Sequence, residues 1–194
     1  MKITRLAFLA LALPFGLGAQ QPAGPPVNPI ATVFKNRTLA QQRLLALAFD
    51  SIPGSMFGYK PTAPQLTIGY VAQHLASDNY FFCNNFGDAK GTPDPMDGTT
   101  ADSIKAKWPK EQLVAKMKAS FAFCETALNQ LTDATLADQI PVTFGGNTRT
   151  ITRAQMALGH VGDMADHYSQ IANYMRLNNM VPPSALPRPA RPTN

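Results

Sequence analysis

Residues 150–179 read TITRAQMALGHVGDMADHYSQIANYMRLNN, and this stretch decides the fold of the chain. At 3.6 residues per turn, His160, Asp163 and His167 fall on one stripe of a helix. Apolar residues share the stripe, so it should face the inside of whatever the helix packs against. Because leaving a buried polar group unpaired costs about 1–3 kcal/mol, these imidazole and carboxylate groups need partners. A divalent metal ion is one such partner.

Three further amphipathic segments precede this helix. Apolar residues that recur at spacings of three and four predict helices over about residues 29–50, 64–87 and 108–130. Four amphipathic helices with connections of moderate length predict an all-α protein, a four-helix bundle. Nothing in the sequence suggests a parallel sheet, which argues against doubly wound folds.

The segment ahead of the last helix contains the apolar piece IPVTF (residues 140–144), followed by Gly145-Gly146-Asn147. This pattern predicts either a small hairpin or an ordered loop. The last helix is expected to begin at a cap formed by Thr150 or Thr152, and the second at a cap formed by Thr62.

The first 20 residues resemble a secretory signal peptide. Lys2 and Arg5 precede an apolar run and small residues, with Ala19 as the expected cleavage position. The run is shorter than the roughly 20 residues that span a bilayer. We therefore expect export to the periplasm or the cell exterior, with no stable membrane span after the signal is removed. The alternative is an anchor retained in the mature protein.

The remaining boundaries follow from composition. Residues 21–29 form a Pro-rich lead-in, residues 30–182 the bundle, and residues 183–194 a Pro-rich tail that cannot continue the last helix. A length of 194 residues suits one domain with a sizeable core.

The chain has two cysteines, Cys83 and Cys124. In an oxidising compartment they would form one disulfide and leave no cysteine unpaired. The alternative is a pair of buried free thiols that act as small hydrophobic residues.

Composition argues against a nucleic-acid partner. The 15% of charged and 45% of hydrophobic residues indicate a folded protein, and the formal net charge is +5. Removing Lys2 and Arg5 with the leader leaves 15 basic against 12 acidic residues, a balance of +3. This mild excess is spread along the chain, whereas a nucleic-acid interface needs clustered basic residues.

All three histidines fall on inward stripes of two predicted helices: His74 on the second, His160 and His167 on the last. Facing helices of a bundle commonly build metal sites this way. Three nitrogen or oxygen ligands with one open position suit zinc, and also nickel, iron or manganese, and a metal-bound water could act as nucleophile or base. The alternative is a set of core histidines hydrogen-bonded to carboxylates, with Asp78 as the partner of His74 and Asp163 as the partner of either His160 or His167.

Two stretches carry a resemblance to a known family. One is Tyr59-Lys-Pro-Thr followed by TIGYVAQHLASDNYFFC (residues 67–83), and the other is GHVGDMADHYSQIANYMRLNNMVPPS (residues 159–184). With the order and length of the four helices, over roughly residues 30–185, they resemble the DinB/YfiT-like superfamily, in particular its exported bacterial members.

The resemblance implies an up-down-down-up four-helix bundle. It also implies a divalent metal, which many members hold through three histidines, one on the second helix and two on the last. His74 and His167 match two of these positions, but the position four residues before His167 is Asp163. The implied ligands are therefore His74, Asp163 and His167, with His160 as an alternative ligand or an outer support. The ion would be zinc, nickel or manganese, or the site is degenerate and empty.

The resemblance leaves three functions open. The first is a metal-dependent hydrolase that uses a metal-bound water on an unidentified small-molecule substrate. The second is a thiol-dependent transferase, which export disfavours because low-molecular-weight thiols are mostly cytosolic. The third is a non-catalytic exported module with a degenerate metal site. A homodimer is a further expectation, because bundles of this kind often pair.

Overall fold

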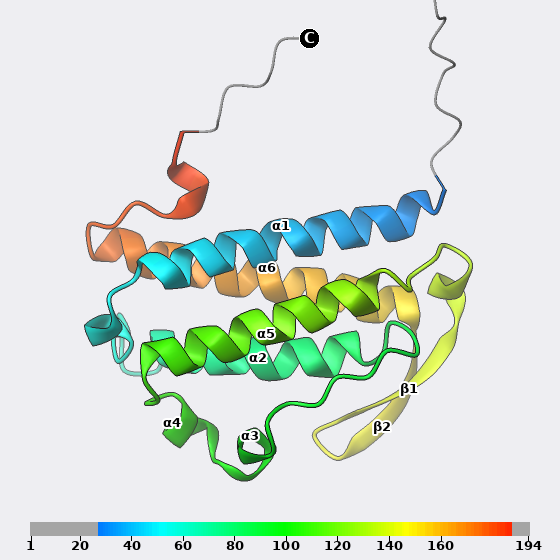
Figure 1. Cartoon of the computed structure of the whole chain (residues 1–194), viewed down its shortest axis with the longest axis horizontal. Coiled ribbons are helices and arrows are strands. Elements are labelled where there is room, and N and C mark those ends of the chain that lie inside the picture. Colours follow the sequence, from blue (N-terminus) through cyan, green and yellow to red (C-terminus); the bar gives the residue numbers. More distant parts are fainter. Residues whose placement is uncertain (1–26, 188–194) are drawn as a thin grey trace, which may run out of the picture.

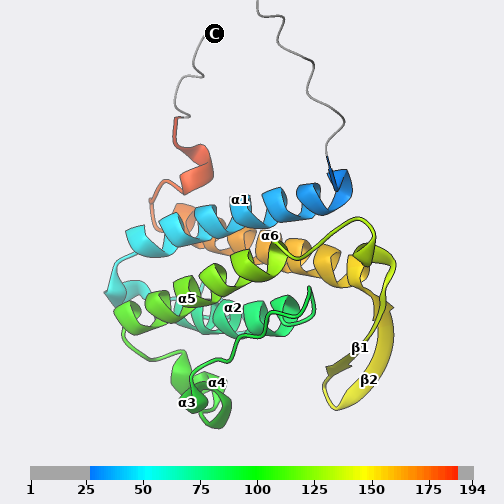
Figure 2. The same cartoon turned by 45° about the vertical axis from the view of Figure 1, so that its right-hand side comes forward.

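The computed structural model describes residues 27–187 and is mostly helical, as expected. Four long helices lie side by side: α1 (Pro29–Ser51), α2 (Ile68–Cys83), α5 (Lys110–Leu128) and α6 (Arg153–Leu177) (Figures 1 and 2). Helix α1 packs beside α6, and α2 beside α5. In Figure 1, α1 and α6 run in one direction, and α2 and α5 in the other. The predicted signal peptide, most of the lead-in and the end of the tail lie outside the described residues.

The helix starts depend on threonine caps. Helix α6 begins after Thr152, which forms a capping box with Gln155, so the second of the two expected caps is the one used. Helix α2 begins four residues later than expected, because Thr67 caps it and accepts a hydrogen bond from Tyr70 N at 3.1 Å. The expected cap, Thr62, donates instead to the side chain of Gln65.

The segment before α6 is a hairpin, not an unpaired loop. Strands β1 (Gln139–Phe144) and β2 (Asn147–Thr152) pair antiparallel, with Phe144 opposite Asn147. The two turn residues, Gly145 and Gly146, have φ values of 57° and 80°. A two-residue turn with both φ values positive favours glycine and joins two twisted strands without distortion. The hairpin ends at Thr152, the cap of α6, and so fixes where that helix begins.

The connection between α2 and α5 holds two short helices that the sequence did not predict. Helix α3 (Pro95–Thr99) and helix α4 (Asp102–Lys105) lie between α2 and α5. An ion pair between Lys116 of α5 and Asp97 of α3, 3.1 Å long, ties this segment to the long helices. Single 3₁₀ turns occur at Gly54–Met56, Thr135–Ala137 and Pro183–Ala185.

The expected disulfide between Cys83 and Cys124 is confirmed. Its Cα atoms are 5.2 Å apart, and it links the last residue of α2 to α5. It lies in one of two apolar clusters, the one that also holds residues of the hairpin. The other cluster fills the opposite half of the four helices. Its largest fully buried side chains are Leu45, Phe49, Ile52, Ile68, Leu75, Leu113, Met117, Met164, Ile171 and Tyr174.

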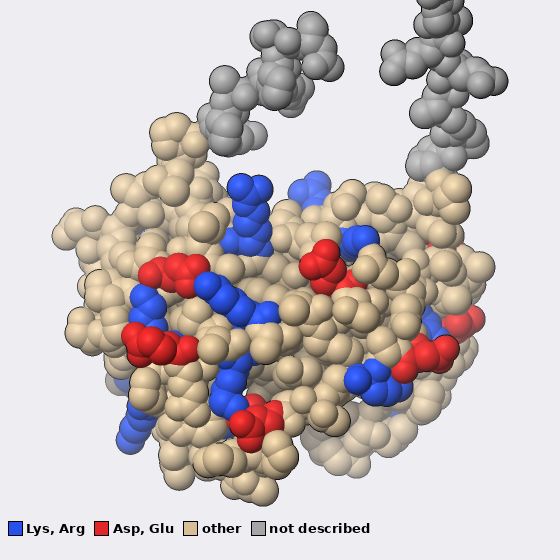
Figure 3. Space-filling view, viewed as in Figure 1, with Lys and Arg blue, Asp and Glu red and all other residues tan. Residues whose placement is uncertain are grey.

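The surface carries both signs of charge. On the face shown in Figure 3, Lys and Arg side chains alternate with Asp and Glu side chains. One surface ion pair joins Lys118 of α5 to Asp50 of α1 at 2.7 Å. Over residues 27–187, no helix combines the length and the apolarity needed to cross a membrane.

Substituting Gly69 by alanine is expected to destabilise the protein by about 1–3 kcal/mol, the usual cost of overpacking a tight contact. An added Cβ would lie 2.2 Å from the carbonyl oxygen of Ala106 and 3.2 Å from that of Phe57. Both neighbours are main-chain atoms, so the segment after α4 must move away from α2. Urea unfolding measures the change.

The control is Gly162→Ala in α6, where an added Cβ meets nothing within 4 Å. Alanine should there raise the free energy of unfolding by about 0.5–1 kcal/mol, because glycine disfavours helix interiors. Equal stabilities of the two variants would contradict the tight packing at Gly69.

Candidate metal centre

The structure brings His74, Asp163 and His167 together between α2 and α6. One potential ligand atom from each residue lies within 4.8 Å of the other two. The two imidazole rings meet edge to face, with centroids 4.9 Å apart. Helical spacing explains the arrangement, because Asp163 and His167 stand one turn apart on α6 and His74 lies in the middle of α2. His167 is buried, whereas the side chain of His74 keeps 32% of its surface exposed. The centre is therefore open on the His74 side.

A chain of hydrogen bonds orients the imidazole of His167. The hydroxyl of Tyr174 donates to the carbonyl oxygen of Leu66 at 3.1 Å, and the amide nitrogen of Gln170 donates to that hydroxyl at 2.8 Å. The carbonyl oxygen of Gln170 then lies 3.4 Å from Nδ1 of His167 and must accept its proton. Nε2 of His167 is left facing Oδ1 of Asp163 at 3.3 Å. This is the support that metal-bound histidines typically receive from their surroundings.

The electrostatics of the centre favour a cation. Burial lowers the pKa of His167, but the hydrogen bond and the charge of Asp163 outweigh burial, and the net pKa is raised. Burial raises the pKa of Asp78 to about 6, and the negative charge of Asp163 adds to this increase against the opposing effect of His74. Oδ2 of Asp78 lies 3.1 Å from Nε2 of His74. Two carboxylates thus lie beside two imidazoles, an arrangement that positive charge stabilises.

One atom of the centre lacks the partner that its burial demands. Oδ2 of Asp163 is buried and accepts no hydrogen bond within the described chain. A buried carboxylate oxygen without a partner is costly, and a metal ion would satisfy it. Two imidazoles and one carboxylate match the donor set of catalytic zinc sites. The residues present therefore fit a divalent ion.

His160 is not one of the three residues whose ligand atoms converge, and its nearest polar contacts are with other residues. Its Nε2 lies 2.8 Å from Oδ1 of Asn79 and 4.0 Å from Sγ of Cys83. It could form a second metal-binding group with Cys83 and Cys124, but the disulfide occupies both sulfur atoms. His160 precedes Asp163 by three residues on α6. It therefore lies about one helical turn nearer the half of the protein that holds the disulfide.

Lowering the pH from about 6.5 to about 4 is expected to destabilise the protein through His160. Burial lowers the pKa of this imidazole to about 4. Between that value and the ordinary value near 6.5, the unfolded state binds more protons than the folded state. Stability contributed by neutral His160 is therefore complete above about pH 6.5 and is lost as the pH falls toward 4, by up to about 3 kcal/mol.

Urea midpoints of the parent and of His160→Gln across this pH range test the prediction. The comparison is needed because the raised pKa of Asp78 acts in the opposite direction over much of the same range. The variant should lose less stability in acid than the parent. Identical losses in the two proteins would contradict the assignment to His160.

Two pockets adjoin the centre. One, of about 720 Å³, opens beside His167 and Gln170. The other, of about 630 Å³, reaches Tyr70, whose ring centroid lies 6.1 Å from that of His74. Gln65 and Leu66 line both pockets and form the wall between them.

The sequence pointed to the three ligands but missed parts of their surroundings. Gln170 and Tyr174 stand on the same stripe of α6 as His167, so helical spacing could have identified their supporting role. Neither pocket was predicted. Each takes part of its wall from the segment before α2, which has no periodic pattern, and no local signal in the sequence indicates how that segment folds.

Comparison with known proteins agrees with the fold. The family model of the DinB superfamily matches residues 38–171. The structure is similar to a mycothiol-dependent maleylpyruvate isomerase, with a TM-score of 0.58 and 12% identity over 73% of this chain. That match spans only 60% of the isomerase. No curated protein sequence matches the chain.

Two other solved structures are similar over nearly their whole length. A DinB-like protein from Bacillus cereus ATCC 10987 has a TM-score of 0.58 and 16% identity over 77% of this chain and 93% of its own. A conserved protein from Enterococcus faecalis has a TM-score of 0.56 and 14% identity over 76% of this chain and 96% of its own. At these identities the similarities establish the fold alone.

Proposed function

We propose that this chain, which belongs to the DinB superfamily, binds a divalent metal ion through His74, Asp163 and His167. Two observations carry the proposal together: ligand atoms of the three residues, from two helices, lie within 4.8 Å of one another, and Oδ2 of Asp163 is buried with no partner among the described residues. Imidazole and carboxylate ligands suit zinc, nickel and manganese.

The reaction that we propose is metal-dependent hydrolysis of a small molecule. A bound divalent ion would supply a Lewis acid that lowers the pKa of a coordinated water. The chain would supply the remaining parts. Gln170 fixes the ring of His167 so that Nε2 faces the centre. Asp78, in contact with His74 on the open side, is the carboxylate placed to accept a proton.

Three structural expectations belong to this proposal. The four long helices form the up-down-down-up bundle of the family, which their running directions in Figure 1 support. Residues 1–20 direct export. The confirmed Cys83–Cys124 disulfide supports an oxidising compartment, where such bonds persist.

A second candidate is thiol-dependent transfer. The observation in its favour is the shared fold with an isomerase described as mycothiol-dependent. A metal at the same centre would then bind a thiolate. Cobalt-loaded protein distinguishes the two, because a small thiol bound to the metal gives a sulfur-to-cobalt absorption band.

Metal content and activity of the purified chain test the proposal. We expect near-stoichiometric zinc, nickel or manganese after loading and dialysis, and loss of the metal in His74→Ala and His167→Ala. The loaded parent should hydrolyse an activated ester such as p-nitrophenyl acetate, and a chelator should abolish the reaction. Failure of the parent to take up any of these ions would overturn the proposal and leave a non-catalytic binding module.

A further inference from the structure

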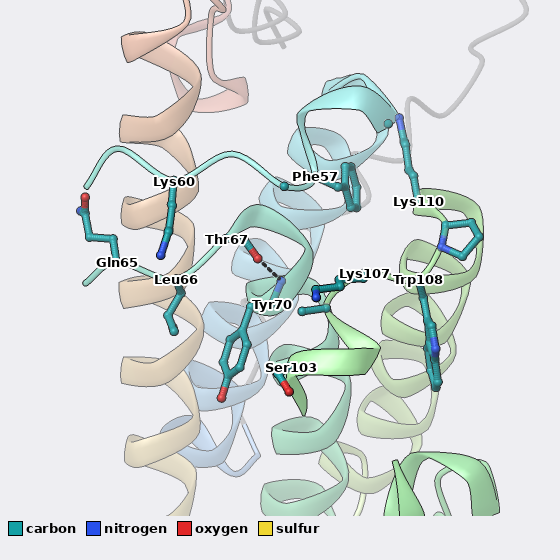
Figure 4. A pocket seen from close by; sticks show the side chains of 14 residues that line it. Phe57, Lys60, Gln65, Leu66, Thr67, Tyr70, Ser103, Lys107, Trp108 and Lys110 are labelled. Atoms are coloured by element: carbon teal, nitrogen blue, oxygen red, sulfur yellow. Dashed lines mark hydrogen bonds between the residues drawn. The ribbon is translucent and has the colours of Figure 1, made fainter. Parts of the chain in front are cut away.

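The pocket beside Tyr70 has a positively charged lining. It lies at the end of the molecule where α2 and α5 begin, and its walls come from the segment after α1, the first turn of α2 and the segment between α4 and α5 (Figure 4). Among the described residues that line it are three lysines and no acidic residue. The lysines are Lys60, Lys107 and Lys110.

The three lysines are not equivalent. Lys110 donates to the carbonyl oxygens of Asp50 and Ile52 at 2.8 and 2.7 Å, so it is held at the end of α1. Lys60 donates to the carbonyl oxygen of a neighbouring loop residue. Lys107 donates its main-chain N–H to the carbonyl oxygen of Ile104, but within residues 27–187 its side-chain amino group has neither a hydrogen bond nor an ion pair. In Figure 4 its side chain lies between Tyr70 and Trp108. It is therefore the amino group available to a ligand.

Two helices add to the positive field. Both α2 and α5 begin at this pocket, and the N-terminus of a helix carries roughly half a positive charge. No side chain caps the first turn of α5. Two carboxylates lie outside the lining: Asp102, which pairs with Lys105 at 2.9 Å and accepts a hydrogen bond from Tyr70 at 3.4 Å, and Glu111 in the first turn of α5. The described residues that line the pocket therefore carry positive charge alone.

The rest of the lining suits an apolar body. Phe57, Leu66 and Trp108 contribute apolar surface. The indole of Trp108 is held from behind by Lys116, whose Nζ lies 5.3 Å from the ring centroid. A pocket with apolar walls and a few placed polar groups is the usual form of a small-molecule site.

We infer that this pocket binds the anionic head group, a carboxylate or a phosphate, of a small molecule with an aromatic or apolar body. Lys107 supplies the charge-assisted hydrogen bond. Tyr70 connects the pocket to the metal centre, because its ring lies against that of His74. The inference rests on the proposed function in that it names the substrate class of that centre.

The test titrates metal-free protein with benzoate, phenyl phosphate and the neutral benzamide, by calorimetry or by amide chemical shifts. At least one of the two anions should bind in a saturable way, whereas benzamide should not, and preference for one anion identifies the head group. Raising the ionic strength from about 0.05 to about 0.5 M should weaken binding. Lys107→Ala should weaken it about threefold to tenfold, and Lys107→Glu at least about tenfold.

The matched control is Lys35→Glu, the same charge change on α1 beside Asn129, and it should alter binding less than about twofold. Equal affinities of Lys107→Glu and Lys35→Glu, equally tight benzamide binding, or no saturable binding would overturn the inference. Unchanged circular dichroism of both variants shows that they fold. Because the titrations use metal-free protein, anion binding without metal uptake overturns only the proposed function, and metal uptake without anion binding overturns only this inference.

Discussion

Replacing Asp163 by alanine is expected to lower the affinity for a divalent ion by more than about a hundredfold, a larger loss than the removal of a supporting group causes. Asp163 supplies the only carboxylate of the three converging ligands, and its Oδ2 has no other partner over residues 27–187. Calorimetric titration with zinc and manganese gives the affinities. In Asp163→Asn, the affinity for zinc should fall less than the affinity for manganese. The amide lacks the negative charge of the carboxylate, and the harder manganese ion depends more on that charge.

Removing the hydrogen-bond support of His167 should lower the affinity for the divalent ion by a smaller amount. Gln170→Leu keeps all three ligands but removes the acceptor for Nδ1 of His167. Its affinity should fall by about tenfold to a hundredfold, the usual range for a group that orients a ligand. Gln112→Leu, the same substitution at an exposed position of α5, is the control and should change little. Unaltered affinity in Asp163→Ala, together with losses in His74→Ala and His167→Ala, would show that another group completes the site.

Loss of the Cys83–Cys124 disulfide is expected to lower the free energy of unfolding by about 2–4 kcal/mol. The bond joins residues 41 apart in sequence, and a loop of that length restricts the unfolded chain considerably. The double variant Cys83→Ala, Cys124→Ala should show the loss in urea unfolding, increased by the cavity that two missing sulfur atoms leave.

Reduced parent protein is the matched control, because it keeps both sulfur atoms in the core. It should lose the part of the stability that comes from the cross-link alone. A reduced parent as stable as the oxidised one would show that the packing of Cys83 and Cys124, both fully buried, matters and that the covalent bond does not.

The long helices could be predicted because their apolar residues repeat with the helical period, which is a local property. The start of α2 could not. Thr62 and Thr67 are both suitable caps, and the choice depends on the amides of Ile68 and Gly69, which donate to the carbonyls of Tyr59 and Phe57. Similarly, α3 was missed because it depends on Lys116, which follows it by some 20 residues and belongs to a different helix.

The same distinction applies to the candidate centre. His74 and His167 could be proposed from helical spacing and family resemblance, and the structure brings them together with Asp163. The different environment of His160 could not be foreseen, since it depends on Asn79 of a facing helix. The pocket beside Tyr70 could not be predicted either, because Lys60 and Lys107 come from separate loops that meet only in the folded chain.

The position of the disulfide has a mechanical consequence. It fastens α2 at its last residue and α5 near its end, whereas the pocket beside Tyr70 lies where both helices begin. The disulfide fixes the distance between the two helices at one end, and their other ends lie roughly 20 Å away along the helix axes. A change of about 5° in the angle between the helices leaves the disulfide in place. It displaces the N-terminal ends of α2 and α5 by about 2 Å, given a rise of about 1.5 Å per residue. The width of the pocket therefore depends on the angle between α2 and α5.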